Sequence, residues 1–292
     1  MTGSASVKQT IVITGSTKGI GKGLAKAFIQ RGHNVVISGR SQADVDACIV
    51  DIINQSSSDD SPNSGHHTQK SIQQSRQQLL GVAANTTSPE QINTLWQQAI
   101  ERFGCVDIWI NNAGLARTTW SIVDTPFSEV THMVNTNILG TINCCQTVAS
   151  KMLQQGHGKI FNMLGGGSDG EYFQGMGVYG TTKRGLDYFT NALSKELKHT
   201  PIIVGKVRPG MVITEGVIRE AKQNMANFSK RRKMANVLCD HVDTVAPFLV
   251  DKMLLVNKTG EKIAWLNPRK MTLRFLGSVF KTPKDKFAQY GL

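Results

Sequence analysis

The sequence predicts an α/β domain: a doubly wound parallel sheet flanked by helices. Three observations support this fold class. Short runs of β-branched and aliphatic residues alternate with longer segments of helical apolar spacing, a glycine-rich turn follows the first run, and the alternation continues to about residue 265. Strands separated by helices imply right-handed crossovers and therefore a parallel sheet. We expect a single domain over residues 1–292.

The elements follow one another in a regular order. The first strand, TIVITG, precedes a helical face formed by Ile20, Leu24, Ala27 and Phe28. The predicted strands cover residues 10–15, 34–39, 79–84, 106–114, 159–163 and 201–207. Further helices are predicted near residues 89–103, 128–155 and 178–198.

The composition excludes several other classes of protein. Of the 292 residues, 40% are hydrophobic and 18% are charged, so the chain can bury a core. This excludes wholesale disorder, collagen-like repetition and a small disulfide scaffold. The five cysteines form no CxxC pair and have no histidine at metal-ligand spacing, so no metal site is predicted. Because neither a signal peptide nor a membrane-spanning apolar run is visible, we expect a soluble protein of a reducing compartment.

Two regions interrupt the alternation. Residues 54–76 are polar, with Ile72 as their only aliphatic side chain, so we expect a mobile surface insertion there. Its paired histidines, His66 and His67, are expected to be solvated. From Glu215 to the end the chain has 15 Lys and Arg against 7 Asp and Glu, which is +8 of the net charge of +12. The net charge of +12 is compatible with an acidic substrate, a nucleic acid or an anionic membrane surface as the partner.

A glycine-rich turn, TGSTKGIG, lies between the first strand and the first helix. Glycines there allow a tight turn and the close approach of a pyrophosphate, to which the helix N-terminus offers free N–H groups and a positive dipole. The sequence therefore predicts a Rossmann-type dinucleotide site formed by Gly15, Ser16, Thr17, Lys18, Gly19, Ile20 and Gly21. Arg40 follows the second strand, where a cation accommodates the 2′-phosphate of NADP. Arg40 and Lys18 together predict NADPH.

Five motifs over residues 8–265 resemble those of the short-chain dehydrogenase/reductase family. They are TGSTKGIG, similar to its TGxxxGxG motif, NNAG (111–114), the helical Asn137, YGTTK (179–183), similar to its YxxxK pair, and RPGMVIT (208–214). The resemblance implies NADPH/NADP+ as the cofactor. It also implies further cofactor contacts from Asn85, Asn112, Ala113, Gly114, Tyr179, Lys183, Pro209, Gly210, Val212 and Thr214.

The same resemblance implies a carbonyl reductase site. Tyr179 and Lys183 are four residues apart and share a helix face. Tyr179 is expected to donate the proton, with the pKa of its phenol, about 10 in water, lowered by the Lys183 ammonium and by the positive charge of the oxidised cofactor. In the family the lysine also binds the nicotinamide ribose and the asparagine holds a water in a proton relay. We expect these roles at Lys183 and Asn137.

The serine that polarises the carbonyl departs from the family pattern. The family places it about 13 residues before the tyrosine, where this chain has Gly166. Ser168, in GGGSDG, is the nearest hydroxyl and the predicted replacement. The segments IFNMLGGGSDG, VYGTTK and PGMVITE resemble more narrowly the chlorophyll(ide) b reductases of the family, which use NADPH to reduce a 7-formyl group to 7-hydroxymethyl. We therefore expect a bulky apolar carbonyl substrate.

Two C-terminal segments are predicted to contact the substrate and partners. Residues 215–238 mix Met and Phe with cations and are expected to form a lid over the substrate, or an ordinary helix packed on the domain. The basic tail, residues 268–292, includes MTLRFLGSVFK, which would lie on a photosynthetic membrane or pack against another subunit of a dimer or tetramer. A cytoplasmic or plastid-stromal location is expected.

Other functions stay open on the sequence alone. The chain could be a general reductase of 3-oxoacyl, steroid-like or xenobiotic carbonyls, or a catalytically silent NADP-binding regulator. Glycine at position 166 favours the silent protein, whereas Asn137, Tyr179 and Lys183 together favour the enzyme. No nucleic-acid partner is predicted, because no basic stretch is interleaved with stacking aromatics.

Overall fold

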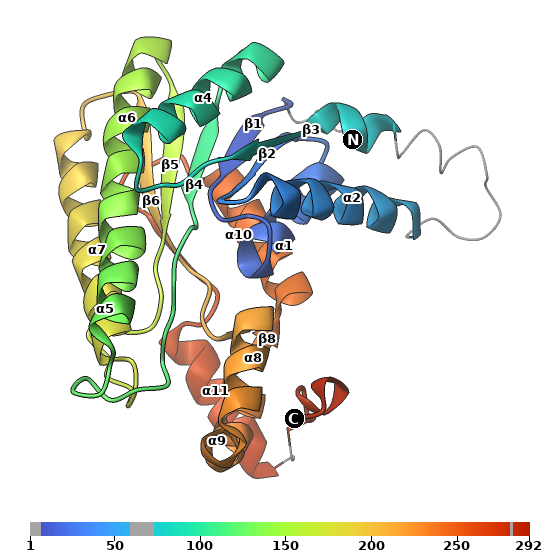
Figure 1. Cartoon of the computed structure of the whole chain (residues 1–292), viewed down its shortest axis with the longest axis vertical. Helices are drawn as coiled ribbons and strands as arrows, with labels where there is room; N and C mark the ends of the chain where they lie inside the picture. The colour runs from blue at the N-terminus through green and yellow to red at the C-terminus, as the bar shows by residue number, and fades with distance from the viewer. Residues whose placement is uncertain (1–6, 59–72, 281–282) are drawn as a thin grey trace.

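A computed structural model describes residues 7–58, 73–280 and 283–292, and within them seven parallel strands form one sheet (Figure 1). The strands are β1 (Thr10–Ile13), β2 (Asn34–Gly39), β3 (Leu79–Ala83), β4 (Ile108–Asn111), β5 (Gly158–Met163), β6 (Ile202–Arg208) and β9 (Lys262–Ala264). Their order is β3-β2-β1-β4-β5-β6-β9, so the strand order reverses between β1 and β4. Ligands bind at the carboxyl ends of the strands at such a switch point. The predicted fold class is confirmed.

Helices cover both faces of the sheet. α1 (Gly19–Gln30), α2 (Gln42–Ser58) and α10 (Val242–Leu255) pack on one face, and α4 (Pro89–Phe103), α6 (Gly140–Gln155) and α7 (Gly177–Glu196) pack on the other (Figure 1). Successive residues of a strand point to opposite faces. Accordingly Ile11 and Ile13 belong to the first apolar core and Val12 to the second, and all three are fully buried.

The predicted helix over residues 89–103 has the same bounds in the structure, because both of its ends carry strong local signals. Ser88 accepts a hydrogen bond from the Gln91 N–H at 3.3 Å, and Pro89 occupies the first helical position. Gly104 then takes a φ of 83°, which ends the helix.

The predicted helix over residues 128–155 is interrupted. It consists of α5 (Phe127–Val134), a π-helical turn η1 (Asn135–Leu139) and α6. A π turn contains one residue more than an α turn, and such turns are frequent at functional sites. This one contains Asn137, which is completely buried.

The polar segment 54–76 differs from the prediction at both ends. α2 extends into it, and residues 73–78 are helical. Gln78 is buried, and its side chain donates to the His33 carbonyl oxygen at 3.1 Å. The described ends of the segment are therefore helical, which the prediction of a surface insertion did not include. Residues 59–72, with the paired histidines, lie outside the described residues.

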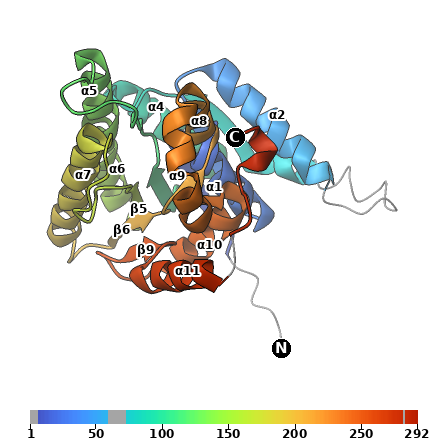
Figure 2. The ribbon, with the colours of Figure 1, turned by 90° about the horizontal axis from the view of Figure 1, so that it is seen from below.

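A second group of helices lies below the sheet in Figure 1, on the side to which the loop after β4 runs. α8 (Glu215–Gln223) and α9 (Met225–Leu238) together span the predicted lid, and α11 (Pro268–Phe280) packs on α9. Strands β7 (Val212–Ile213) and β8 (Asp240–His241) pair with each other at the two ends of this segment, and a final turn η2 (Ala288–Tyr290) follows. Seen from below, α8 and α9 lie in front of the sheet (Figure 2). Within the described ranges no helix has the length and apolar character needed to cross a bilayer.

Candidate active site

The glycine-rich turn is held in place by the NNAG segment after β4. The Asn112 side chain donates to the carbonyl oxygens of Thr14 and Gly15 at 2.9 and 2.8 Å. The backbone N–H groups of Asn112 and Ala113 both donate to the Thr14 hydroxyl at 3.0 Å. These two predicted cofactor segments therefore form one unit where β1 and β4 end.

Glycine is required at two points of this unit. Gly15 has a φ of 60°, and a Cβ there would lie 2.7 Å from the Ala113 Cα. A Cβ at Gly21 would lie 2.6 Å from the Gly15 carbonyl oxygen. The bare backbone thus lets the turn pack closely and keeps the N-terminus of α1 open, as a bound pyrophosphate requires.

The N-terminus of α1 attracts an anion in this structure. Its first turn contains no acidic residue, and the cap residue Lys18 makes no side-chain capping bond. Instead the Gly19 N–H donates to the Glu215 carboxylate at 3.0 Å. Since a carboxylate already lies at this N–H, the residues present fit the pyrophosphate of a dinucleotide. Sequence reasoning missed Glu215, because no local pattern indicates a partner 196 residues away.

Two cations lie near the end of β2. Arg40 is exposed and makes no hydrogen bond or ion pair with any described residue. Lys18 Nζ lies 3.7 Å from Asp44 Oδ1, but both side chains are more than half exposed, so this pair is weak. Both cations are therefore free to contact a 2′-phosphate. Asn85 follows β3, and its Oδ1 accepts from the Thr87 N–H at 3.1 Å.

Tyr179 and Lys183 lie one helical turn apart on α7, as their spacing predicts. Lys183 is buried, and its Nζ donates to the Met163 carbonyl oxygen at 2.9 Å. The same Nζ lies 5.8 Å from the centre of the Tyr179 ring. A Cβ at Gly114 would lie 3.3 Å from Asn137 Oδ1 and 3.6 Å from Lys183 Nζ. The structure thus brings together Asn137, Tyr179, Lys183 and the NNAG segment, residues 111–114. We call this group of residues the corner of the candidate site.

Asn137 fastens the loop after β4 to α7. Its Oδ1 accepts from the Leu115 N–H at 2.8 Å. Its Nδ2 donates to the Leu115 carbonyl oxygen and to the Thr182 hydroxyl, both at 2.9 Å. Both amide hydrogens are therefore used inside the protein, and this side chain positions the loop after β4 against α7.

Burial shifts the pKa values of the two candidate catalytic residues, Tyr179 and Lys183. It raises the pKa of Tyr179 to about 12 and lowers the pKa of Lys183 to about 8. The expectation that Lys183 lowers the pKa of Tyr179 is therefore not met by the chain on its own. The reason is geometric, since the ammonium is bound to the Met163 carbonyl oxygen and desolvation of both groups dominates.

The Tyr179 hydroxyl lies against Gly165 and not against Ser168, which is the predicted replacement for the family serine. A Cβ at Gly165 would overlap the hydroxyl oxygen and lie 3.0 Å from the Tyr179 Cζ. No described residue forms a hydrogen bond with that hydroxyl. Ser168 is completely buried, and its Oγ lies 3.5 Å from Asp169 Oδ1, while its carbonyl oxygen accepts from Arg184. No hydrogen bond joins Ser168 to Tyr179, because the glycine loop turns between them.

Ionic contacts hold this glycine loop. Arg208, at the end of β6, pairs with both Asp169 and Glu171, and Lys262 of β9 pairs with Asp169 at 2.5 Å. The Glu171 carboxylate also accepts from the Gly167 N–H at 3.0 Å. Burial would raise the pKa of Asp169, but Lys262 and Arg208 outweigh it and the pKa is lowered. Residues far apart in the sequence thus set the shape of the loop.

The turn after β6 leads directly into the predicted lid. Gly210, which follows Pro209, has a φ of 76°, and a Cβ there would lie 2.9 Å from the Leu266 Cβ. Val212 is buried in β7. Thr214 caps α8 by accepting from the Val217 N–H at 3.4 Å. These cofactor candidates therefore fix where α8 starts.

The lid is tied to the loop after β4, and only part of its apolar surface is free. The Thr118 hydroxyl donates to the Glu220 carboxylate of α8 at 2.7 Å. Val217 is 38% exposed. Phe228 instead packs edge-on against the ring of Phe287, with centres 5.0 Å apart. The segment therefore packs on the C-terminal residues through Phe228 and leaves Val217 partly exposed, and its role as a lid stays a prediction.

Asp240, which the sequence did not single out, joins the lid to the tail. It accepts hydrogen bonds from the Trp265 and Arg274 side chains, both at 2.7 Å, and from Lys286 Nζ at 3.1 Å. Burial would raise the pKa of Asp240, but these hydrogen bonds outweigh it and the pKa is lowered. Because Asp240 follows α9, lid and tail are fastened to each other.

The chain matches known proteins over most of its length. A family model described as short chain dehydrogenase matches residues 9–59 and 54–225. The probable chlorophyll(ide) b reductase NYC1, chloroplastic, of Arabidopsis thaliana is 32% identical over 271 residues, which are 92% of this chain and 53% of that protein. The chlorophyll(ide) b reductase NOL, chloroplastic, of Oryza sativa subsp. japonica is 31% identical over 245 residues, 82% of this chain and 65% of that protein. The chain therefore spans about half the length of the first relative.

A solved structure has the same fold. The 3-ketoacyl-(acyl-carrier-protein) reductase from Brucella melitensis, complexed with NADH, aligns with a TM-score of 0.69 and 22% identity, over 91% of this chain and 100% of that chain. At this identity the likeness establishes the shared fold alone.

Proposed function

Since the chain belongs to the short-chain dehydrogenase family, we propose that it is an NADPH-dependent reductase of a bulky apolar aldehyde or ketone, and that its substrate is the 7-formyl group of chlorophyll(ide) b. One observation carries the proposal. The Tyr179 phenol has no hydrogen-bond partner among the described residues and lies beside the buried ammonium of Lys183. The relatives named as chlorophyll(ide) b reductases support the choice of substrate.

The residues of the corner have distinct tasks in a carbonyl reduction. NADPH, when bound, supplies the hydride. Tyr179 stays protonated at neutral pH because its pKa is about 12, so its hydroxyl can donate the proton that the reduced oxygen needs. Lys183, with a pKa of about 8, is charged at neutral pH and stabilises the phenolate that remains. Asn137 keeps the loop after β4 in place against α7.

The dinucleotide would be held by the chain's own backbone and two cations. The glycine turn and the first N–H groups of α1 suit the pyrophosphate, and Arg40 with Lys18 suits the 2′-phosphate. Glu215 has to leave the Gly19 N–H before another anion binds there. Because NADH lacks the 2′-phosphate that Arg40 would contact, we expect Arg40→Ala to weaken binding of NADPH more than binding of NADH.

Apolar side chains near the corner support a bulky apolar substrate. A Cβ at Gly177, two residues before Tyr179, would lie 2.6 Å from the Ile122 Cδ1, so the loop after β4 reaches the start of α7. In that loop Ile122 is 64% exposed and Val123 is 91% exposed. An exposed apolar group beside a polar reaction centre is typical of a site for a large apolar ligand.

The proposal is tested by NADPH consumption with chlorophyllide b, a 3-oxoacyl thioester and a simple aldehyde. Tyr179→Phe removes the proton donor, so turnover of the formyl chlorin should fall by about 10²–10⁴-fold. Tyr188→Phe is the matched control, because Tyr188 lies on the same helix and is 77% exposed. Its turnover should equal that of the wild type.

The possible results distinguish a reductase of the formyl chlorin, a reductase of other carbonyls and a catalytically silent regulator. Turnover of the 3-oxoacyl thioester or the aldehyde alone would reject the formyl chlorin and retain a reductase. Tight NADPH binding without turnover of any carbonyl would reject the reductase and favour a silent regulator.

We further propose that the tail contacts a membrane surface. No residue of α11 is buried, and Leu273, Val279 and Phe280 are 69%, 78% and 88% exposed. Apolar side chains near a basic helix favour an anionic lipid surface. Co-sedimentation with anionic vesicles should therefore exceed that with zwitterionic ones, and Phe280→Asp should weaken it.

The assembly and location follow from the same proposal. We expect a homodimer or homotetramer, measured by light scattering on a sizing column. If Phe280→Asp dissociates this oligomer without affecting vesicle binding, α11 is a subunit contact instead. The relatives named as chloroplastic support a location on the stromal side of a plastid membrane, which imaging of a fluorescent fusion tests.

A further inference from the structure

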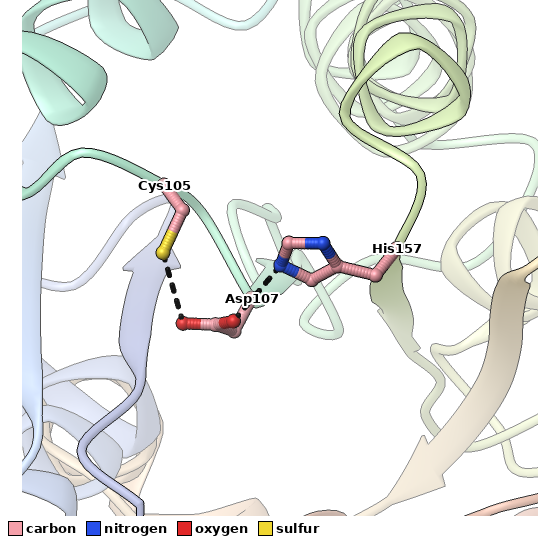
Figure 3. Close-up of side chains that lie close together, drawn as sticks. All are labelled: Cys105, Asp107 and His157. Atoms are coloured by element: carbon pink, nitrogen blue, oxygen red, sulfur yellow. Dashed lines mark hydrogen bonds and ion pairs between the residues drawn. The ribbon is translucent and has the colours of Figure 1, made fainter.

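Three potential metal ligands, Cys105, Asp107 and His157, lie close together (Figure 3). They lie at the amino ends of β4 and β5, whereas the glycine turn follows the carboxyl end of β1. Cys105 and Asp107 precede β4, and His157 precedes β5. Because β4 and β5 pair in parallel, their amino ends lie side by side and bring the three residues together. Sequence spacing predicted no metal site, since Asp107 and His157 are 50 residues apart.

Two of the separations between ligand atoms are close to those of a tetrahedral zinc site. Cys105 Sγ lies 3.6 Å from Asp107 Oδ2, and His157 Nε2 lies 3.2 Å from Asp107 Oδ1. One ligand atom from each residue lies within 4.8 Å of the other two. Zinc bonds of about 2.3 Å to sulfur and about 2.0 Å to nitrogen or oxygen place tetrahedral ligand atoms about 3.3–3.6 Å apart. The two short contacts go to different oxygens of Asp107, so the side chains have to rotate for all three residues to bind one ion.

Neighbouring groups already orient these ligands. The Thr10 N–H donates to Asp107 Oδ2 at 2.7 Å. The Gln155 side chain bonds the N–H and the carbonyl oxygen of Val106 at 3.1 and 3.0 Å, and its Nε2 lies 3.2 Å from His157 Nε2. Contacts of this kind fix the ligands of metal sites. The Gln155 contact to His157 has to be exchanged for the metal on binding.

The charge of the cluster suits a divalent cation. Among the described residues His157 is the only ion-pair partner of Asp107. A divalent ion takes the place of the Cys105 thiol proton and compensates the charges of both the thiolate and the Asp107 carboxylate.

We propose that Cys105, Asp107 and His157 bind a zinc ion, with a water molecule as the fourth ligand. A thiolate and an imidazole together favour zinc over Mg²⁺ and Ca²⁺, which prefer oxygen ligands. The ion forms bonds to sulfur, nitrogen and oxygen, only the S–H bond breaks, and its proton goes to solvent without any redox change. The zinc ties β4 to β5 far from Tyr179, so it acts on stability rather than on carbonyl reduction.

Cobalt is the probe, because Co²⁺ bound to a thiolate shows a sulfur-to-metal charge-transfer band in the near ultraviolet. Chelator-treated full-length protein should bind one Co²⁺ per chain with this band, and Zn²⁺ should displace it. Cys105→Ser should abolish the band, and His157→Gln should weaken Co²⁺ binding at least tenfold. His132→Gln is the matched control, since His132 is exposed on α5 and distant in sequence from the cluster.

Folding and metal binding are separated by two further readouts. Cys105→Ser should bind NADPH as the wild type does, because the glycine turn lies at the other end of the sheet. Zn²⁺ should raise the Tm of the wild type and leave that of Cys105→Ser unchanged. The proposal would be overturned if Co²⁺ bound without the sulfur-to-metal charge-transfer band, or if Cys105→Ser still showed this band. Either result would indicate adventitious binding only.

Discussion

A serine at position 165 should disable Tyr179, although it would place a hydroxyl beside the tyrosine as the family pattern does. The Cβ of this serine would lie much less than 3.0 Å from the Tyr179 hydroxyl oxygen, and Cβ atoms in real proteins do not approach other atoms so closely. The atoms that it meets are the Tyr179 hydroxyl oxygen and Cζ, so the phenol itself has to retreat by roughly 1 Å. A misplacement of about 1 Å costs about 100-fold in rate, or about 2.7 kcal/mol in the barrier.

Gly166→Ser is the matched control for Gly165→Ser. A Cβ at Gly166 would meet the terminal methyl group of Met176 at 2.6 Å, which is the flexible end of that side chain and can move aside. Neither glycine has a positive φ, so neither substitution strains the backbone. The two variants therefore differ in the neighbour that they displace.

The assay is NADPH consumption at saturating carbonyl substrate, with NADPH affinity measured by fluorescence and folding by thermal denaturation. We expect kcat of Gly165→Ser to fall about 100-fold with NADPH affinity unchanged, and Gly166→Ser to keep most of its rate. If Gly165→Ser kept the wild-type kcat, the proposed geometry of the proton donor would be wrong.

Gly15→Ala should weaken NADPH binding about tenfold in a fluorescence titration, because the added Cβ would meet the Ala113 Cα at 2.7 Å and displace the turn from the pyrophosphate position, at a cost of about 1–2 kcal/mol. Glu215→Gln should tighten it in the same titration, since a neutral amide competes less well for the Gly19 N–H; unchanged affinity would contradict that competition. Turnover should decrease as the pH rises through about 8, because Lys183 then loses its proton, and a flat profile there would exclude this role. Asp240→Asn should lower the Tm at neutral pH. Because the folded pKa of Asp240 is lowered, its stabilising contribution is complete above the unfolded pKa of about 3.9 and is lost as the pH falls through the folded pKa, so the Tm difference should vanish in acid.

Local and periodic features of the fold could be predicted from the sequence. The bounds of α4 follow from Ser88, Pro89 and Gly104, whose effects reach only a few residues. The shared face of Tyr179 and Lys183 follows from helical spacing alone. Both predictions depend on interactions within one element, where sequence distance and spatial distance correspond.

Contacts between distant segments could not be predicted in this way. Distance along the chain from Tyr179 predicts Ser168 as the serine, whereas the shape of the glycine loop depends on Arg208 and Lys262, which belong to later strands. The contact of Glu215 with the glycine turn and the bonds of Asp240 to the tail have the same origin. A single sequence shows the residue types in these contacts but not their pairing.

The π-helical turn at Asn137 limits how the length of this chain can vary. Each residue of a helix rotates the following ones by about 100°, so an insertion or deletion within 135–139 would turn α6 about its axis. Cys144 and Val148, both completely buried against the sheet, would then rotate toward solvent. A deletion would also restore a regular helix and remove Asn137 from its contact with Leu115. Related chains of different length should therefore place their extra residues in surface loops and keep this turn unchanged.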